Sequence, residues 1–577
     1  MLVVVTFVGS LIAIYSVGYM HGDQGYARYF AEIALFIFSM TGLVLASNFI
    51  LLYAFWEGVG LCSYLLIGFW FNKPSAAAAA RKAFLVTRIG DVGMILGIIL
   101  LWLRLGPMTG YTLDYDKVFT EATLLDSASL AAICLLLFCG AVGKSAQFPL
   151  YVWLPDAMEG PSPVSALIHA ATMVTAGVYL VARCMPLFHA APTWVLLLVA
   201  GIGAFTALLA ALIALTQNDL KRVLAYSTIS QLGYMFLGLG AGTENLVALA
   251  VIAAIFHLFT HAFFKALLFL AAGSVMHAMG NVIDMRRFGG LRYVLKTTHW
   301  TFLCGAAALA GFPILSGFWS KDEVLATTLA AVDLGHSFGW LYLVLFVSAL
   351  ATAGLTAFYT FRAYFKTFWG QLVVPPEAGE HVHESPPVML VPLIILALGA
   401  VLVGFLQTPW TPWLGNFLSE HWIEAPFSGF RAPKPEAHIH WAVVMLLSSL
   451  TAIAGIAAAW WLYVREPGFA DRLTRSWQVW YQLSVNKFHV DEIYEAFIVQ
   501  PLAGFAEFCR VVDQYVVDGI VDLLGHVPRL VGALLRPIQN GLLQFYGLAM
   551  VLGLAVFLFF LTWNWAELMA RLAGSGK

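Results

Sequence analysis

The sequence predicts an all-α polytopic membrane protein with about fourteen transmembrane helices. Of its 577 residues, 61% are hydrophobic and only 11% are charged, whereas soluble domains carry about 25% charged residues. Apolar stretches of about 20 residues, the length that crosses a bilayer, recur along the chain. One stretch in each half is interrupted by Gly and Pro beside a lysine, which is typical of transporters built from two repeats.

The apolar stretches begin at Leu2 and follow one another along the chain. The expected spans are residues 2–19, 31–47, 49–71, 84–104, 128–148, 162–185, 193–216, 222–241, 246–278, 299–328, 338–365, 387–406, 439–463 and 545–565. Lys and Arg gather in alternate connections, including those that hold Arg28 and Lys221, and the positive-inside rule places these connections in the cytoplasm. Met1 would then lie outside, so we expect an even number of further spans upstream.

The composition argues against several classes of function. A net charge of −2 disfavours nucleic acid as a partner. The sequence has no P-loop and no G-x-G-x-x-G motif after a strand. Its six cysteines are scattered through apolar segments without a C-x-x-C pair, which favours small buried side chains over an iron–sulfur or disulfide role. We therefore expect no redox centre, cofactor or metal in this chain.

The chain is organised around the apolar stretch 140–182, which contains Lys144 and His169 with four prolines between them. A lysine inside a span costs about 2.5–3.5 kcal/mol on insertion scales, so a partner or a water-filled path should retain it. Pro149 and Pro155 remove backbone donors, and the helix should therefore break just after the lysine. A broken helix beside a buried lysine and histidine suits a proton or cation path.

Further charges occupy the third and fourth spans. Glu57 lies near the middle of the third span, where a carboxylate must be paired or held uncharged. It either takes part in ion movement or forms a static ion pair that joins two helices. Arg88 and Asp91 are three residues apart on one face of the fourth span. A structural pair near the membrane surface and a functional pair are equally open interpretations.

One stripe of the ninth span carries three titratable residues. His257, His261 and Lys265 recur at intervals of four and therefore share one helical face. Two histidines at this spacing can bind a metal, but neither a third ligand nor the glutamate of an H-E-x-x-H motif accompanies them. Imidazole titrates near neutral pH, so a proton relay is favoured over a metal site or a structural role.

A second interrupted helix is expected in the tenth span. Gly311 and Pro313 lie shortly before Lys321 and Asp322 in A-L-A-G-F-P-I-L-S-G-F-W-S-K-D-E. The plan is that of the Lys144 helix, and two such helices in two halves indicate sites near the middle of the membrane. The alternative places Lys321 and Asp322 in water near a helix end.

The segment from about 491 to 540 interleaves charged and apolar residues at helical spacing and is too polar to span a membrane. About fifty residues of helix would reach roughly 75 Å, which exceeds the thickness of a bilayer. We expect this segment to lie along the membrane surface, with the final span anchoring its far end. Two shorter surface helices are the alternative.

Five segments resemble a known family. They read W-E-G-V-G-L-C-S-Y from Trp56, G-K-S-A-Q-F-P from Gly143, H-L-F-T-H-A-F-F-K from His257, G-F-W-S-K-D-E from Gly317 and N-K-F-H-V-D-E-I-Y-E from Asn486. These segments closely resemble the L-subunit family of bacterial NADH-quinone oxidoreductase, the distal antiporter-like subunits of respiratory complex I. They are also similar to the large subunit of Mrp-type cation/proton antiporters. The family has two helices before the one that begins at Leu2.

The resemblance implies roles for the buried charges. Glu57 and Lys144 would form the glutamate–lysine pair of a first half-channel, with Arg88 and Asp91 as an accessory pair. His169 would relay protons from Lys144 toward the centre. The remaining implied residues are the central group His257, His261 and Lys265, and the terminal exchange pair Lys321 and Asp322.

The resemblance also implies an organisation with two inverted antiporter-like repeats. The expected parts are a first helix (1–28), a first half-channel repeat (29–190), a second half-channel repeat (191–370), additional helices (371–485), a lateral amphipathic helix (486–544) and a C-terminal anchor (545–577).

The function implied is proton translocation in the bacterial cytoplasmic membrane, coupled to quinone reduction. FMN, iron–sulfur clusters and quinone would be bound by partner subunits. Other partners would be lipids and an adjacent M-type antiporter-like subunit, which the lateral helix would also contact on the cytoplasmic side. A subunit of an Mrp-like Na⁺/H⁺ antiporter, a membrane-bound hydrogenase or a bicarbonate-uptake complex is the alternative.

Overall fold

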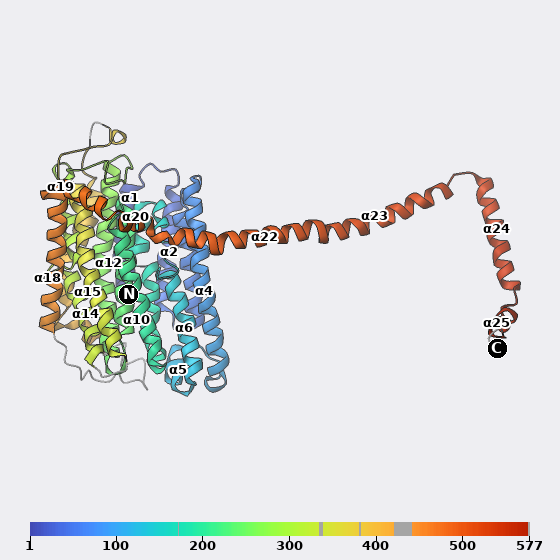
Figure 1. The fold of residues 1–577 in the computed structure, drawn as a ribbon, viewed down its shortest axis with the longest axis horizontal. Coiled ribbons are helices and arrows are strands. Elements are labelled where there is room, and N and C mark those ends of the chain that lie inside the picture. Colours follow the sequence, from blue (N-terminus) through green and yellow to red (C-terminus); the bar gives the residue numbers. More distant parts are fainter. Residues whose placement is uncertain (171, 334–337, 380–381, 420–440, 575–577) are drawn as a thin grey trace. The chain divides into compact units, whose positions relative to one another are not determined.

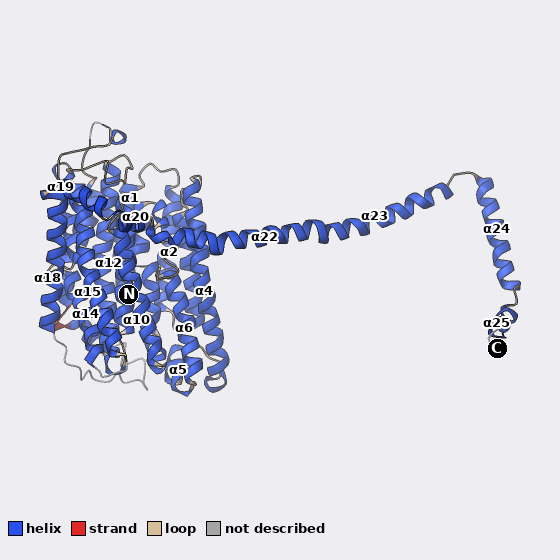
Figure 2. Ribbon diagram, viewed as in Figure 1, coloured by secondary structure: helices blue, strands red, loops and turns tan. Residues whose placement is uncertain are grey.

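The computed structural model describes residues 1–170, 172–333, 338–379, 382–419 and 441–574, and these residues are helical almost throughout (Figure 1). Within these ranges the strands are β1 (Gln407–Thr408) and β2 (Thr411–Pro412), which pair antiparallel in one short hairpin (Figure 2). The chain divides into two compact units, Met1–His489 and Val490–Lys577.

The first unit is a bundle of helices that stand side by side (Figure 1). After a π-helical turn at Val4–Val8, its first half contains α1 (Gly9–Tyr19), α2 (Tyr26–Leu45), α3 (Phe49–Ile67), α4 (Pro74–Thr109), α5 (Tyr115–Thr120), α6 (Ser127–Lys144), α7 (Ser162–Ala170), α8 (Ala176–Arg183), α9 (Met185–Ala190) and α10 (Thr193–Ala214). It continues with α11 (Leu220–Gly240), α12 (Val247–Ala278), α13 (Lys296–Ala310), α14 (Ser316–Asp333), α15 (Gly339–Phe368), α16 (Pro387–Leu402), α17 (Trp413–Leu418), α18 (Trp441–Trp460), α19 (Pro467–Ser476) and α20 (Gln478–Val485).

Local sequence signals explain where several of these helices begin. The side chain of Asn48 caps α3 by accepting a hydrogen bond from Leu51 N at 2.8 Å. Asp126 caps α6 through Ser129 N, and Asp219 caps α11 through Arg222 N, both at 3.0 Å. Such caps satisfy amide groups that have no partner inside the helix.

The helix interruptions expected beside Lys144 and Lys321 are confirmed. The α6 helix ends at Lys144, and turns with a short 3-10 helix, η3 (Asp156–Glu159), lead to α7. The stretch expected as one span at 299–328 forms two helices, because Gly311 adopts φ +76° and ends α13 before α14 begins. Glycine adopts this left-handed conformation without the penalty of a Cβ atom.

The centre of the first unit is α12, a helix of 32 residues whose side chains are buried on nearly every face. It packs against α7, α11, α13, α14 and α16. A helix enclosed in this way has no solvated face, so its polar side chains need partners inside the bundle.

The all-α, multi-pass membrane architecture is confirmed. Eleven described helices are long and apolar enough to span a bilayer, and Val4–Tyr19 is a shorter apolar helix. The α11, α13 and α14 helices fall outside that criterion because they are more polar or shorter, so the count of about fourteen spans stays a prediction.

The second unit begins with an unbroken helical segment, Val490–Ile538, in which α21 (Val490–Tyr494), α22 (Gln500–Val512) and α23 (Asp518–Leu535) are joined by π-helical turns. The helix continues through Pro501 and Pro528. It is followed by α24 (Leu543–Thr562) and α25 (Trp565–Gly574). The alternative of two separate shorter helices is therefore not observed, whereas a position along the membrane surface stays a prediction.

Candidate functional site

The first cluster of buried charges lies where α3, α4 and α6 meet. Trp56 Nε1 donates a hydrogen bond of 2.6 Å to Asp91 Oδ1. Lys144 Nζ lies 3.2 Å from Asp91 Oδ2, and the side chains of both residues are only 1% exposed. Asp91 is therefore the counter-ion of the buried lysine.

Glu57 pairs with Arg88 instead of Lys144. This arrangement differs from the expected glutamate–lysine pair with a separate accessory pair. Arg88 and Asp91 lie three residues apart on one face of α4. Glu57 on α3 pairs with Arg88, and Lys144 on α6 pairs with Asp91. The Arg88–Glu57 pair is also more accessible, with side chains 37% and 20% exposed.

Lys144 reaches α3 at Gly60, one turn after Glu57. A Cβ atom placed on Gly60 would lie 2.5 Å from Lys144 Nζ, so this position needs a residue without a side chain. We expect Gly60→Ala to displace the ammonium without removing its counter-ion. It should lower severalfold the proton translocation that the resemblance implies, and destabilise the protein less than loss of Asp91 would, because the lysine end is flexible. Transport by the assembled complex in sealed vesicles is the measurement.

Gly201→Ala is the matched control, since a Cβ atom there meets nothing within 4 Å. Native transport by Gly60→Ala would show that the position of the ammonium does not matter.

The turns after Lys144 are fixed by their own side chains, which donate hydrogen bonds to backbone carbonyls of neighbouring segments. Trp153 Nε1 donates to Gly143 O at 3.0 Å, and Ser145 Oγ donates to Val174 O at 2.7 Å. The nearby acidic residues have their own partners, because Asp156 pairs with Lys82 at 2.7 Å and Glu159 pairs with Lys73 at 2.6 Å. Asp91 thus remains the acidic partner of Lys144.

His169 lies at the end of α7 and is fully buried. Its ring packs against Phe269 with centroids 4.8 Å apart. Within the described part of the chain, neither ring nitrogen has a hydrogen-bond partner. Buried polar atoms usually have a hydrogen-bond partner. The two ring nitrogens of His169 can therefore form transient hydrogen bonds to water or to another titratable group.

The three residues on the α12 stripe are all fully buried. Lys265 Nζ donates to Ser227 Oγ at 2.7 Å, and His257 Nδ1 is 2.9 Å from Ser320 Oγ. The rings of His257 and His261 lie 6.4 Å apart. Among the described residues, no carboxylate forms an ion pair with Lys265, so its charge has no close neutralising partner.

Lys321 occupies the second interrupted helix in a buried position. Its Nζ donates to Leu309 O at 2.5 Å, a carbonyl at the C-terminal end of α13. The last carbonyls of a helix have no partner within it, so the break at Gly311 supplies this acceptor. Lys321 is 3% exposed and Asp322 is 2% exposed, which contradicts the alternative that they lie in water.

Sequence reasoning placed Lys221 in a cytoplasmic connection, whereas the structure buries this side chain to 2% exposure. Its Nζ donates to Met158 O at 2.6 Å and to Gly160 O at 2.9 Å. These carbonyls belong to the turns around η3, which the sequence does not place beside α11. Other partners that sequence reasoning missed are Trp56, Ser227 and Ser320, ordinary core residues whose function is apparent only from their contacts.

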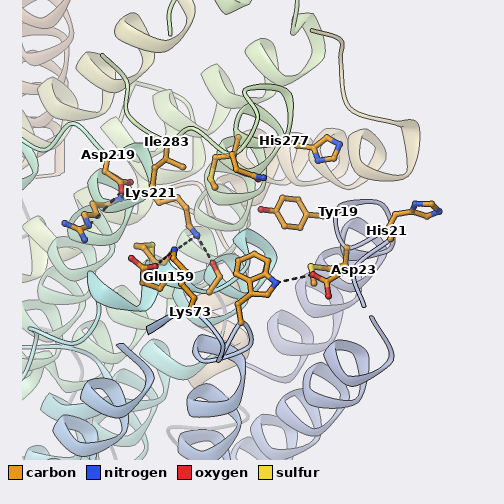
Figure 3. A pocket seen from close by; sticks show the side chains of 17 residues that line it. Tyr19, His21, Asp23, Lys73, Glu159, Asp219, Lys221, His277 and Ile283 are labelled. Carbon is orange, nitrogen blue, oxygen red and sulfur yellow. Dashed lines mark hydrogen bonds and ion pairs between the residues drawn. The ribbon is translucent and has the colours of Figure 1, made fainter. Parts of the chain in front are cut away.

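Lys221 also lines a cavity of about 560 Å³ at one end of the first unit. The cavity is formed by the end of α1, the α3–α4 connection, η3, the start of α11 and the end of α12. Figure 3 shows Lys221 and Glu159 to one side of it and Tyr19 and Asp23 to the other. The polar lining makes the cavity suitable for water beside the buried lysine.

Buried lysines beside interrupted helices place this protein in the class of antiporter-like membrane subunits. Residues 46–352 match the family described as NADH:quinone oxidoreductase/Mrp antiporter, TM, and residues 1–30 match NADH-Ubiquinone oxidoreductase (complex I), chain 5 N-terminus. The chain belongs to the NADH:quinone oxidoreductase/Mrp antiporter family.

Its relatives include NAD(P)H-quinone oxidoreductase chain 5 of Picosynechococcus, which is 44% identical over 96% of this chain and 85% of the relative. F(420)H(2) dehydrogenase subunit L of Methanosarcina mazei is 45% identical with the same coverage. NADH-quinone oxidoreductase subunit L of Neisseria meningitidis is 41% identical over 98% of this chain and 86% of the relative.

The fold is also similar to a chain in the solved Mrp complex from Dietzia, with a TM-score of 0.71 and 29% identity. The match covers 92% of this chain and 55% of the Dietzia chain, so this protein spans little more than half of that subunit.

Proposed function

We propose that this chain translocates protons across a membrane and that quinone reduction in partner subunits drives the transport. The observation that carries the proposal is the row of titratable side chains inside the first unit, all of them buried except the partly exposed pair Glu57 and Arg88. Its members are Glu57, Arg88, Asp91, Lys144, His169, Lys265, His261, His257, Lys321 and Asp322.

The three lysines in this row are held by different partners, and this difference favours stepwise transfer. Lys144 has a carboxylate, Lys265 has a hydroxyl group, and Lys321 has a backbone carbonyl. A carboxylate stabilises the charged ammonium more than a neutral acceptor does. The positive charges of neighbouring buried lysines repel each other, so protonation of one lysine promotes proton loss from the next.

The energy needed is modest. Moving one proton against 100 mV takes about 2.3 kcal/mol, which is within the range of interactions between neighbouring buried charges. The cavity beside Lys221 supports an inlet for protons, because the cytoplasmic connections assigned by the positive-inside rule include the α3–α4 and α10–α11 connections that line it.

Several finer assignments belong to the same proposal. The membrane is the bacterial cytoplasmic membrane, the neighbouring partner is an M-type antiporter-like subunit, and the Val490–Ile538 helix lies on the cytoplasmic side. FMN, iron–sulfur clusters and quinone are bound by partner subunits. The full-length relatives named as quinone oxidoreductase subunits support these assignments.

A second candidate function is Na⁺/H⁺ exchange as a subunit of an Mrp-like antiporter. The similarity to the Dietzia Mrp complex favours it. One relative is named as a subunit of F(420)H(2) dehydrogenase, so membership of the family does not by itself define the electron donor.

The test uses the purified complex in sealed vesicles, with quinone reduction and internal acidification followed together. We expect Lys265→Met to lower the protons moved per quinone reduced by at least twofold, because the central group loses its lysine and keeps only two histidines to carry charge. The assembled complex should still reduce quinone in leaky vesicles.

Unchanged proton movement in assembled Lys265→Met complex would contradict the proposal. A strict requirement for Na⁺, together with acidification that needs no quinone, would favour the antiporter.

A further inference from the structure

One face of α14 carries a polar stripe apart from Lys321. Ser316, Ser320, Glu323 and Thr327 recur at spacings of three and four residues and therefore lie on the same side of the helix. All four are buried, with exposures of 0%, 0%, 4% and 1%. Burial of a carboxylate is energetically costly, so we expect Glu323 to have a function on this stripe.

The stripe contacts the central helix at Ser320. Ser320 Oγ is 2.9 Å from His257 Nδ1 and 2.7 Å from Thr260 Oγ1. Lys321 is the next residue, about 100° further around the helix, and its ammonium binds Leu309 O. The hydrogen bond from His257 to α14 is thus made to Ser320 and not to the lysine.

Glu323 lies one turn beyond Ser320 and connects the stripe to the β1–β2 hairpin. Gln407 Nε2 donates to Glu323 Oε1 at 3.0 Å, while Gln407 Oε1 accepts from Gly415 N at 2.8 Å. Trp410, at the tip of this hairpin, is 76% exposed. A single amide side chain therefore separates the buried carboxylate from an exposed turn.

We propose that Glu323 is a second proton-carrying residue on α14, which receives protons from His257 through Ser320 and releases them at the hairpin. The inference rests on the proposed function and adds an outlet beside Lys321. The imidazolium of His257 gives a proton to Ser320 Oγ, and the hydroxyl proton passes to the Glu323 carboxylate. Loss of that proton to water at the hairpin restores the carboxylate and leaves His257 neutral.

The geometry of α14 supports this transfer. Side chains three residues apart on a helix have Cβ atoms about 5–6 Å apart, a gap that Ser320 and Glu323 can bridge directly or through one water. Arg362 and Lys366 lie in the last two turns of α15, at the end that leads into α16, so the positive-inside rule places that end in the cytoplasm and the hairpin after α16 on the outer face. Protons released there leave the cytoplasm.

The experiment compares Glu323→Gln, Ser320→Ala and Lys265→Met in the assembled complex in sealed vesicles. Glutamine keeps an acceptor for Gln407 and removes only the titratable group. We expect Glu323→Gln and Ser320→Ala each to lower the protons moved per quinone by at least a third, with normal assembly and quinone reduction. Glu323→Asp should recover part of the loss.

Glu377→Gln is the matched control, because Glu377 is 47% exposed and its hydrogen bonds from Arg287 lower the pKa of its carboxyl group. We expect native proton movement from it. Native proton movement in Glu323→Gln or in Ser320→Ala, while Lys265→Met lowers it, would overturn this inference alone. Native proton movement in Lys265→Met would overturn the proposed function itself.

Discussion

Replacement of Asp91 by leucine should destabilise the first unit by about 3–5 kcal/mol, the usual effect of removing one partner of a buried ion pair. Lys144 would keep a buried charge without its counter-ion, since both side chains are 1% exposed and 3.2 Å apart. Heat unfolding of the detergent-purified protein is the measurement, with recovery of the assembled complex as a second measure.

The double variant Asp91→Leu with Lys144→Met separates stability from transport. Two apolar side chains in place of a buried ion pair are often neutral or stabilising, so folding should recover. Proton transport should stay low, because neither residue can then titrate. Equal destabilisation by the single and the double variant would contradict the assignment of Asp91 as the counter-ion.

Glu57→Gln is the matched comparison. Its carboxylate pairs with Arg88, and both side chains are partly exposed. Both carboxylate oxygens of Glu57 are buried, but glutamine keeps an oxygen that can accept a hydrogen bond from Arg88. The free energy of unfolding should therefore change by about 1–2 kcal/mol, less than for Asp91→Leu. The two acidic residues would then differ in their effect on stability, although the resemblance placed Glu57 beside the lysine.

The interrupted helices could be predicted because their causes are local. Gly311 ends α13 by its own conformation, and prolines follow Lys144 within a few residues. The stripe of His257, His261 and Lys265 was equally visible, because helical periodicity alone places these residues on one face.

Partner choice could not be predicted, because it depends on how separate helices meet. Asp91 and Glu57 are both carboxylates in apolar spans, and only the packing of α3, α4 and α6 assigns Lys144 to Asp91. The sequence places Lys221 in a connection, and its burial depends on two carbonyl acceptors from the distant segment around η3. Glu323 likewise gained a partner only through the distant Gln407.

Charged substitutions on the helix Val490–Ile538 should have a large effect on assembly of the complex. Its apolar side chains are exposed within this chain, including Phe505 and Phe508, each at 62%. Under the proposed function, we expect neighbouring membrane subunits to cover part of this row of exposed aromatic and aliphatic residues. We expect Phe505→Asp with Phe508→Asp to remove most of this chain from the purified complex, because burial of each phenylalanine contributes about 1.5–3 kcal/mol and a buried aspartate adds a further penalty.

Native gel electrophoresis of solubilised membranes measures that loss, and Glu507→Gln is the control on the charged side of the same helix, where Glu507 pairs with Arg510. A helix that braces neighbouring subunits must be continuous and in contact with them, so a break or a charged substitution acts first on assembly. A helix that transmits force would instead leave the complex intact and lower the protons moved per quinone. Complete assembly of the double aspartate variant with a reduced proton ratio would therefore reject the brace and support force transmission.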